Sequence, residues 1–282
     1  MRQRLAVSRK GMSMSELLIG MVILAIVGMG LTQTLRSQAR YFDHQKTGNL
    51  ARAVSRGPIN RVVSDLRMVE AKGGMISASA SQIEVRVPYA MGVVCGTSNN
   101  STHVSLLPVD SAMYAAPGYS GYAWRGGDGT YRYKEDNQTK DIGTLTVCND
   151  AQIGTLTASG AKVIRITPTL PDTASYGTPV FLYRKIRYSF AASGMVPGSI
   201  GLWRTRMETG QSEELSAPYD GAKFRFFVGS SLNAQDDPPG NLSTVRGIEL
   251  NMTGTSERAP SGGVARQKAP FITAVFFKNR LD

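Results

Sequence analysis

The sequence predicts an α+β fold, in which a long N-terminal α-helix packs on an antiparallel β-sheet head with a loop-rich insertion. Three observations support this prediction. Residues 17–35 form an apolar run that contains no charged residue. Apolar residues then continue at helical spacing to about residue 70. Beyond residue 75 the chain changes to short alternating segments separated by turn residues, which is typical of strands.

The apolar run from Leu17 to Leu35 is 19 residues long, and about 20 apolar residues cross a bilayer as an α-helix. A short basic leader ending in Lys10-Gly11 precedes the apolar run. A single carboxylate, Glu16, lies immediately before its first residue. The positive leader predicts that the N-terminus stays in the cytoplasm and that the bulk of the chain lies across the membrane. Placing a carboxylate at the edge of a membrane-spanning segment costs free energy, so the presence of Glu16 there indicates that this residue has a function.

The stretch from Gly11 to Leu17 reads Gly-Met-Ser-Met-Ser-Glu-Leu. It resembles the class III signal of type IV pilins and type II secretion pseudopilins, which reads Gly-Phe-Thr-Leu-Ile/Val-Glu-Leu. Met12 and Ser15 depart from that motif. The resemblance implies that prepilin peptidase cleaves between Gly11 and Met12 and that the new N-terminus at Met12 is methylated. Glu16 would then be the fifth mature residue, which in this family sets the register between subunits.

An ordinary secretory signal or signal anchor is the alternative interpretation of the N-terminus. The small-residue stretch Ser37-Gln38-Ala39 could then be the cleavage site. That interpretation places Glu16 near the start of the apolar core, where an ionised group is unfavourable. It also leaves the helical periodicity after residue 36 unexplained.

Composition and charge bound the rest of the chain. After a leader and an anchor, the 282 residues leave roughly 210 for one exported domain, enough to bury a core. Removing the four basic leader residues lowers the formal charge from +11 to +7. The remaining Lys and Arg residues are scattered rather than gathered in a tract, which favours a solvated basic surface over a nucleic-acid site. Binding of DNA stays a weaker alternative.

The chain contains two cysteines, Cys95 and Cys148. In an exported domain such a pair predicts one disulfide. Two free buried thiols are the alternative, because spacing alone does not show that the two residues meet.

One helix is expected from about residue 13 to residue 70, with a kink at Gly57-Pro58 and an end at Gly73-Gly74. Its first half is apolar all round, and its second half is amphipathic and should pack on a sheet. The expected organisation is a cleaved leader (1–11), a transmembrane and filament-core helix (12–36), an amphipathic continuation (37–72) and a periplasmic β-rich head (73–282).

Alternation and turn residues predict the strands of the head, and residues 96–143 are expected to be a loop-rich insertion with short strands. The expected strands cover residues 83–87, 93–95, 131–133, 144–148, 162–167, 180–190, 200–207, 223–228, 248–252 and 271–277.

Three segments further resemble the large PilW-like minor pilins and, second, the J-type minor pseudopilins. They are the helix end Val63-Ser64-Asp65-Leu66-Arg67, the strand Leu202-Trp203-Arg204, and the C-terminal stretch from Phe271 to Asn279. The resemblance touches both ends of the chain and leaves residues 75–175 unmatched. It implies the pilin fold, with the long helix against the sheet.

The sequence contains no evident pattern of catalytic residues, so we expect no catalytic site and no cofactor. His44 falls on the predicted helix and His103 in a Ser/Asn-rich loop, and neither has metal-ligand spacing. An irregular calcium site within 128–141 or 235–237 stays open. Tyrosines 114, 119, 122, 131 and 133 could form an adhesive surface or, as we favour, pack a small β subdomain.

The expected function is therefore that of a minor type IV pilin, acting in initiation, assembly or at the tip of a filament. Its partners would be other pilins through the N-terminal helix, prepilin peptidase and an inner-membrane assembly platform. It would sit in the inner membrane as a single-pass protein with a periplasmic head, then in a filament. A J-type pseudopilin of type II secretion and an anchored periplasmic binding or adhesin module are the alternatives.

Overall fold

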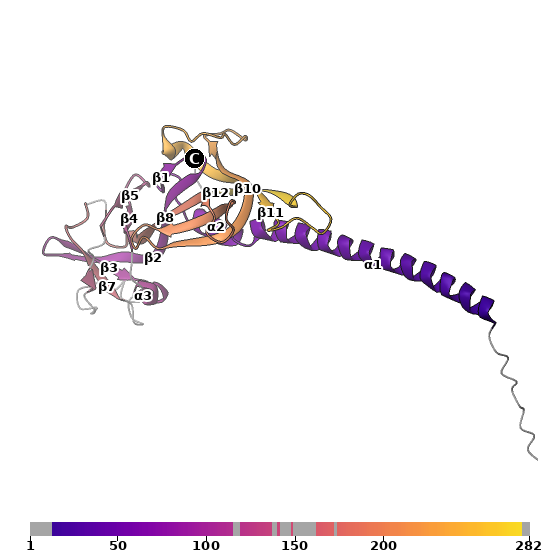
Figure 1. Ribbon diagram of the computed structural model, residues 1–282. Coiled ribbons are helices and arrows are strands. Elements are labelled where there is room, and N and C mark those ends of the chain that lie inside the picture. The colour runs from indigo at the N-terminus through magenta and orange to yellow at the C-terminus, as the bar shows by residue number, and fades with distance from the viewer. Residues whose placement is uncertain are drawn as a thin grey trace, which may run out of the picture.

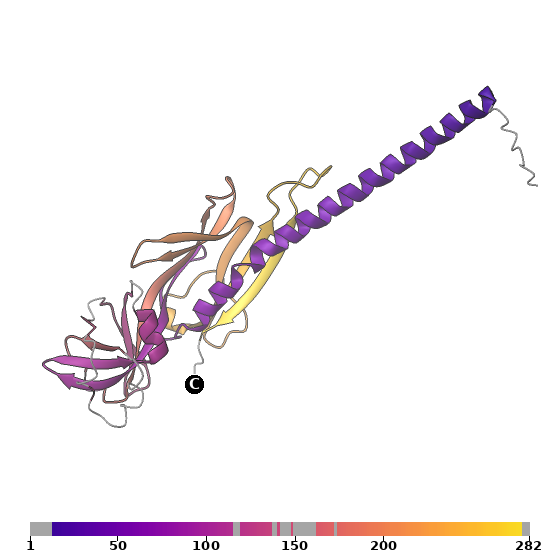
Figure 2. The ribbon, with the colours of Figure 1, turned by 90° about the horizontal axis from the view of Figure 1, so that it is seen from below.

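The computed structural model describes residues 13–114, 119–136, 140–141, 148, 162–171 and 174–277. They form an α+β molecule in which a long N-terminal helix stands against one large antiparallel sheet (Figure 1). About half of the helix projects beyond the sheet, so the molecule is elongated. The view from below shows that the rest of the helix lies across the sheet (Figure 2).

The long helix is broken where the sequence predicts. Helix α1 spans Met14–Arg56 and helix α2 spans Ile59–Arg67, with Gly57-Pro58 between them. Proline has no backbone N–H and its ring crowds the preceding turn, so the helical hydrogen bonding is interrupted there. Helix α2 ends three residues before the predicted end at 70. Gly73, expected at the helix end, lies instead in the turn before the first strand, where φ is 82°.

The sheet contains twelve strands among the described residues, and their main order is β12-β11-β10-β9-β8-β2-β3-β7-β6. Strand β1 pairs with β2, and β4 pairs with both β5 and β8. The strands are β1 Met75–Ala78, β2 Gln82–Ser98, β3 Ser101–Leu106, β4 Gly121–Arg125, β5 Tyr131–Lys134, β6 Lys140–Asp141, β7 Val163–Ile166, β8 Pro179–Ala192, β9 Ile200–Arg206, β10 Ser212–Val228, β11 Val245–Thr255 and β12 Lys268–Phe276. A short helix, α3, spans Pro108–Tyr114.

Most of the predicted strands are present, and several are longer than expected; β10 begins at Ser212 rather than at 223. The strand expected over 144–148 falls outside the described residues except for Cys148. Residues 96–143 were expected to be a loop-rich insertion with short strands. The short strands are present, but helix and strand make up more of the described stretch than expected. That stretch contains the end of β2 and all of β3, α3, β4, β5 and β6.

Two hydrophobic cores share the sheet. The larger core lies between the helices and the strands β1, β2 and β8 to β12, and it includes Val62, Leu66 and Phe224. The smaller core lies in the distal unit formed by β3, β4, β7 and the adjoining ends of β2 and β8. Tyr122 is fully buried in this smaller core, and Tyr114 and Tyr119 pack against it. These tyrosines therefore pack a β subdomain, which is the favoured of the two interpretations.

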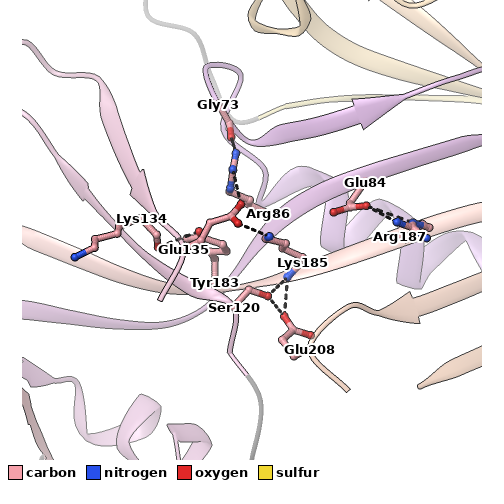
Figure 3. A network of polar contacts seen from close by, with 10 residues as sticks. All are labelled: Gly73, Glu84, Arg86, Ser120, Lys134, Glu135, Tyr183, Lys185, Arg187 and Glu208. Carbon is pink, nitrogen blue, oxygen red and sulfur yellow. Dashed lines mark hydrogen bonds and ion pairs between the residues drawn. The ribbon is translucent and has the colours of Figure 1, made fainter. Parts of the chain in front are cut away.

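A network of polar contacts joins the two units where β2 and β8 pass from one core to the other (Figure 3). The carboxylate of Glu135 accepts from Arg86 at 3.2 Å and from Lys185 at 2.7 Å. These two cations hold the pKa of the Glu135 carboxyl below its usual value, Lys185 having the larger effect. Arg86 also donates to the carbonyl oxygen of Gly73 at 2.5 Å. One glutamate thus connects the distal unit to the strands of the main sheet.

The two cysteines form a disulfide between β2 and residue 148, as expected for an exported domain. Their Cα atoms are 5.0 Å apart, and 53 residues separate them in the chain. Cys95, Cys148 and Val163 pack together as a small buried cluster. Closing a loop of this length stabilises a fold by roughly 4 kcal/mol in the chain-entropy account.

Candidate functional site: the projecting half of the long helix

The first half of α1 exposes apolar side chains on every side. From Met14 to Leu35 the large apolar residues are all exposed, among them Leu24 at 72% and Ile26 at 67%. Within the part of the chain that the structure describes, this is one helix long and apolar enough to cross a membrane. Its apolar window has no residue buried against the head. A helix that is apolar all round requires an apolar environment from outside the molecule.

The second half of α1 belongs to the head. Its buried residues, Thr47, Ala51 and Ser55, recur every four positions and so form one stripe. Gly254 of β11 faces this stripe, and a Cβ at that position would lie 2.2 Å from the carbonyl oxygen of Ala51. The glycine and the small helix residues therefore allow the strand to approach the helix backbone closely.

Glu16 and Ser13 cap the start of α1. The hydroxyl of Ser13 accepts from the backbone N–H of Glu16 at 3.3 Å, and the Glu16 carboxylate accepts from the backbone N–H of Ser13 at 2.9 Å. This reciprocal pair is a capping box, and the carboxylate also interacts favourably with the helix dipole. Glu16 therefore lies at the end of the projecting helix, beside the peptide that follows Met12. Gly11 and Met12 lie outside the described residues.

A buried ion pair connects the helix end to the sheet. Asp65 of α2 accepts from the Tyr188 hydroxyl at 2.6 Å and from Arg204 of β9 at 3.1 and 3.2 Å. The side chains of Arg204 and Asp65 are only 5% and 12% exposed. The sequence placed Asp65 and Arg204 in two separate motifs, and the structure brings them together. The pairing of these two residues was not predicted, and neither was the hydrogen bond from Tyr188 to Asp65.

A second polar contact holds α1 at the level where it leaves the head. The carboxylate of Asp43 accepts from Arg258 at 2.6 and 3.1 Å and from the backbone N–H of Ser261 at 2.6 Å. These hydrogen bonds, that of Arg258 first, hold the pKa of Asp43 well below its usual value. Both partners of Asp43 come from the loop between β11 and β12. This loop was not singled out in the sequence.

The histidines and acidic turns show no metal centre. His103 is in β3 and buried, not in a loop as expected, and burial lowers the pKa of its imidazole. Asp236 contacts Lys223 and Arg225, and Asp128 accepts from Thr130. Among the described residues no three His, Cys, Asp or Glu side chains gather at metal-binding distance. The calcium site left open within 128–141 or 235–237 therefore gains no support from these residues.

Many basic side chains of the head are neutralised by carboxylates. The pairs include Arg187 with Glu84, Arg225 with Glu249, and Lys268 with Asp220. A surface of such pairs presents little net positive charge to a phosphate backbone, whose binding depends on unpaired Lys and Arg. Each of these pairs is neutral by itself, and the chain as a whole keeps a formal charge of +11.

No family profile matches the chain, and neither the curated proteins nor the solved structures give a match. The functional assignment therefore depends on the residues and on their arrangement.

We predict that removing one partner of the Asp65–Arg204 pair destabilises the head strongly. Arg204→Leu removes the close, buried cation of Asp65 and leaves only the exposed Arg61, 3.9 Å from the carboxylate. Breaking a buried pair by removing one partner costs about 3–5 kcal/mol. Chemical denaturation with two spectroscopic probes would measure the free energy of unfolding. The matched control is Lys268→Met, which breaks an exposed pair and should change stability by less than about 1 kcal/mol. Equal, small effects of the two substitutions would show that the buried pair contributes little.

Proposed function

We propose that the protein is a minor type IV pilin. The single observation that carries this proposal is the long helix itself, one half apolar on every side and the other half part of an antiparallel β head. A helix apolar on all faces fits a bilayer, and it equally fits the centre of a bundle of like helices. Pilin subunits need both environments in turn, because they are stored in the membrane and then assembled.

The carboxylate of Glu16 suggests how neighbouring subunits would be aligned. In a bundle of apolar helices, hydrophobic contact alone fixes no axial register, since any sliding of one helix along another buries similar surface. A carboxylate carried into the bundle must find a cation or donors there. The α-amino group at Met12 of a neighbouring subunit is the nearest cation, and methylation leaves it able to carry a proton. Pairing with Glu16 would then set the stagger between subunits.

The proposed course begins in the inner membrane. The basic leader stays in the cytoplasm, the helix spans the bilayer and the head folds in the periplasm, where the Cys95–Cys148 disulfide can form. Prepilin peptidase then removes residues 1–11 and an inner-membrane platform adds the subunit to a filament. The disulfide and the projecting helix support this order.

Two alternatives share part of this account. A J-type pseudopilin of type II secretion would use the same helix and the same Glu16, and loss of the protein would then abolish secretion rather than piliation. An anchored periplasmic binding module would use the helix only as an anchor. In that case the chemistry of residue 16 would be unimportant.

We predict a mature protein that begins at Met12 and carries an N-methyl group. The resemblance of residues 1–17 to a pilin signal implies cleavage after Gly11 and methylation of the new N-terminus, so both should be found in the membrane-bound protein. N-terminal sequencing and intact mass of the purified chain measure this directly. The matched variant Gly11→Val should remain uncut. An uncut wild-type chain, or a start near residue 39, would contradict the pilin assignment.

We predict that Glu16→Ala spares membrane insertion, removal of residues 1–11 and folding of the head, but impairs association with partner pilins. The reason is that the register-setting charge is lost while the apolar surface is kept. Co-purification with other pilins and a count of filaments measure the effect. Glu16→Asp should be intermediate, and Asp237→Ala, which removes an exposed loop carboxylate of the head, should behave as wild type. Normal association and piliation of Glu16→Ala would refute the role of this residue.

A further inference from the structure

The loop between β11 and β12, residues 256–267, lies along α1 toward its projecting half (Figures 1 and 2). Asp43 of the helix holds it through Arg258 and the backbone of Ser261. Gly262 lies beside Arg40, because a Cβ at that position would be 3.5 Å from the Arg40 Nε atom. The loop is therefore fixed against the helix just beyond the apolar run.

The position of this loop follows from helix geometry. Arg40 is five residues beyond Leu35, which corresponds to about 7.5 Å along the axis at 1.5 Å per residue. The polar headgroup layer on each side of a bilayer is roughly 5–8 Å thick. If the apolar run fills the hydrocarbon core, Arg36 lies within the headgroups and the loop tip beside Arg40 lies at their outer boundary.

The side chains at this level suit an anionic lipid surface. Val264, at the loop tip, is fully exposed. Arg36, Arg40 and Arg266 are exposed as well, and none of the three forms an ion pair within the described residues. The carboxylate of Asp43 is occupied by Arg258, which leaves Glu257 as the one exposed carboxylate of the loop. Positive charge therefore predominates here.

The neighbouring turn of α1 adds aromatic surface. Tyr41 and Phe42 are exposed at 62% and 65% and do not pack on the head. Tyrosine is enriched where a membrane meets water, because its ring is amphipathic. The helix thus offers aromatic and basic side chains at the level where the loop tip offers an aliphatic one.

We propose that the loop 256–267 and residues 36–42 of α1 form a second membrane contact that binds anionic phospholipid headgroups. This proposal rests on the membrane anchorage of the proposed function. Arg36, Arg40 and Arg266 contact lipid phosphates, and Val264 enters the headgroup layer. An arginine near an anionic surface strengthens binding roughly fivefold. Because the loop is fixed to the helix, this contact sets the angle between the head and the bilayer.

The experiment uses the full chain reconstituted in vesicles of phosphatidylcholine, with or without phosphatidylglycerol. A polarity-sensitive fluorophore is attached at Val264→Cys, and Leu232→Cys is the matched control. Leu232 is also apolar and 85% exposed, but it lies beyond the other end of β11, roughly 34 Å away along the strand. We expect a headgroup-borne quencher to quench the label at 264 and not the label at 232, with stronger quenching in anionic vesicles.

Charge variants test the recognition itself. In the 264-labelled chain, Arg40→Gln with Arg266→Gln should remove most of the additional quenching seen with phosphatidylglycerol. Lys72→Gln, which removes an exposed charge beyond α2, should leave it unchanged. Both variants alter exposed side chains, so the unfolding temperature of the head should not change.

Four outcomes overturn the proposal. They are equal quenching at 264 and 232, equal quenching at 264 in the two lipid mixtures, insensitivity to the arginine substitutions, and shielding of 264 in native membranes but not in pure lipid. The last would show that a protein covers the loop. A label at Val27→Cys separates these failures from loss of the anchor: if a quencher in the acyl region reaches 27, the helix is in the bilayer.

Discussion

The exposed apolar surface of the first half of α1 is the constraint on which the rest of the structure depends. Thirteen large apolar side chains from Met14 to Leu35 have no partner in the head. Burying a side chain of this kind is worth about 1.5–3 kcal/mol, so the surface represents on the order of 20 kcal/mol or more. A domain with a typical net stability of 5–15 kcal/mol does not leave such a surface in water. The environment that covers it must come from lipid or from other helices.

The head is built so that it does not need this surface. Its larger core begins only with the second half of α1, where small residues face Gly254, and the buried Asp65–Arg204 pair then joins the helix end to β9. The contact of Asp43 with the β11–β12 loop marks the transition. Helix α1 therefore connects the folded head with the separate apolar environment that its projecting half requires.

The helices and strands that depend on local apolar periodicity could be predicted from the sequence. The contacts that depend on packing between distant segments could not. The helix, its break at Gly57-Pro58 and the alternating strands β8 and β9 follow from apolar spacing and turn residues. Strand β3 was not predicted because four of its six residues are polar and it follows the turn residues Asn99 and Asn100. The structure nevertheless buries all six of its residues, His103 among them. Asp65 and Arg204 were noted in separate motifs 139 residues apart, and nothing local indicates that they meet. The β11–β12 loop has the composition of an ordinary turn, and its importance comes from where the fold places it.

The central claim is that the projecting half of α1 is covered on all sides while the second half is covered on one side. Single cysteines placed in turn from residue 17 to residue 56 and treated with a water-soluble maleimide in native membranes test it directly, since the two native cysteines are held in a disulfide. The account predicts protection at every position up to residue 35, then labelling with a period near 3.6 and protection at 47, 51 and 55. Periodic labelling within residues 17–35 would contradict it, because it would show that only one face of this helix is covered.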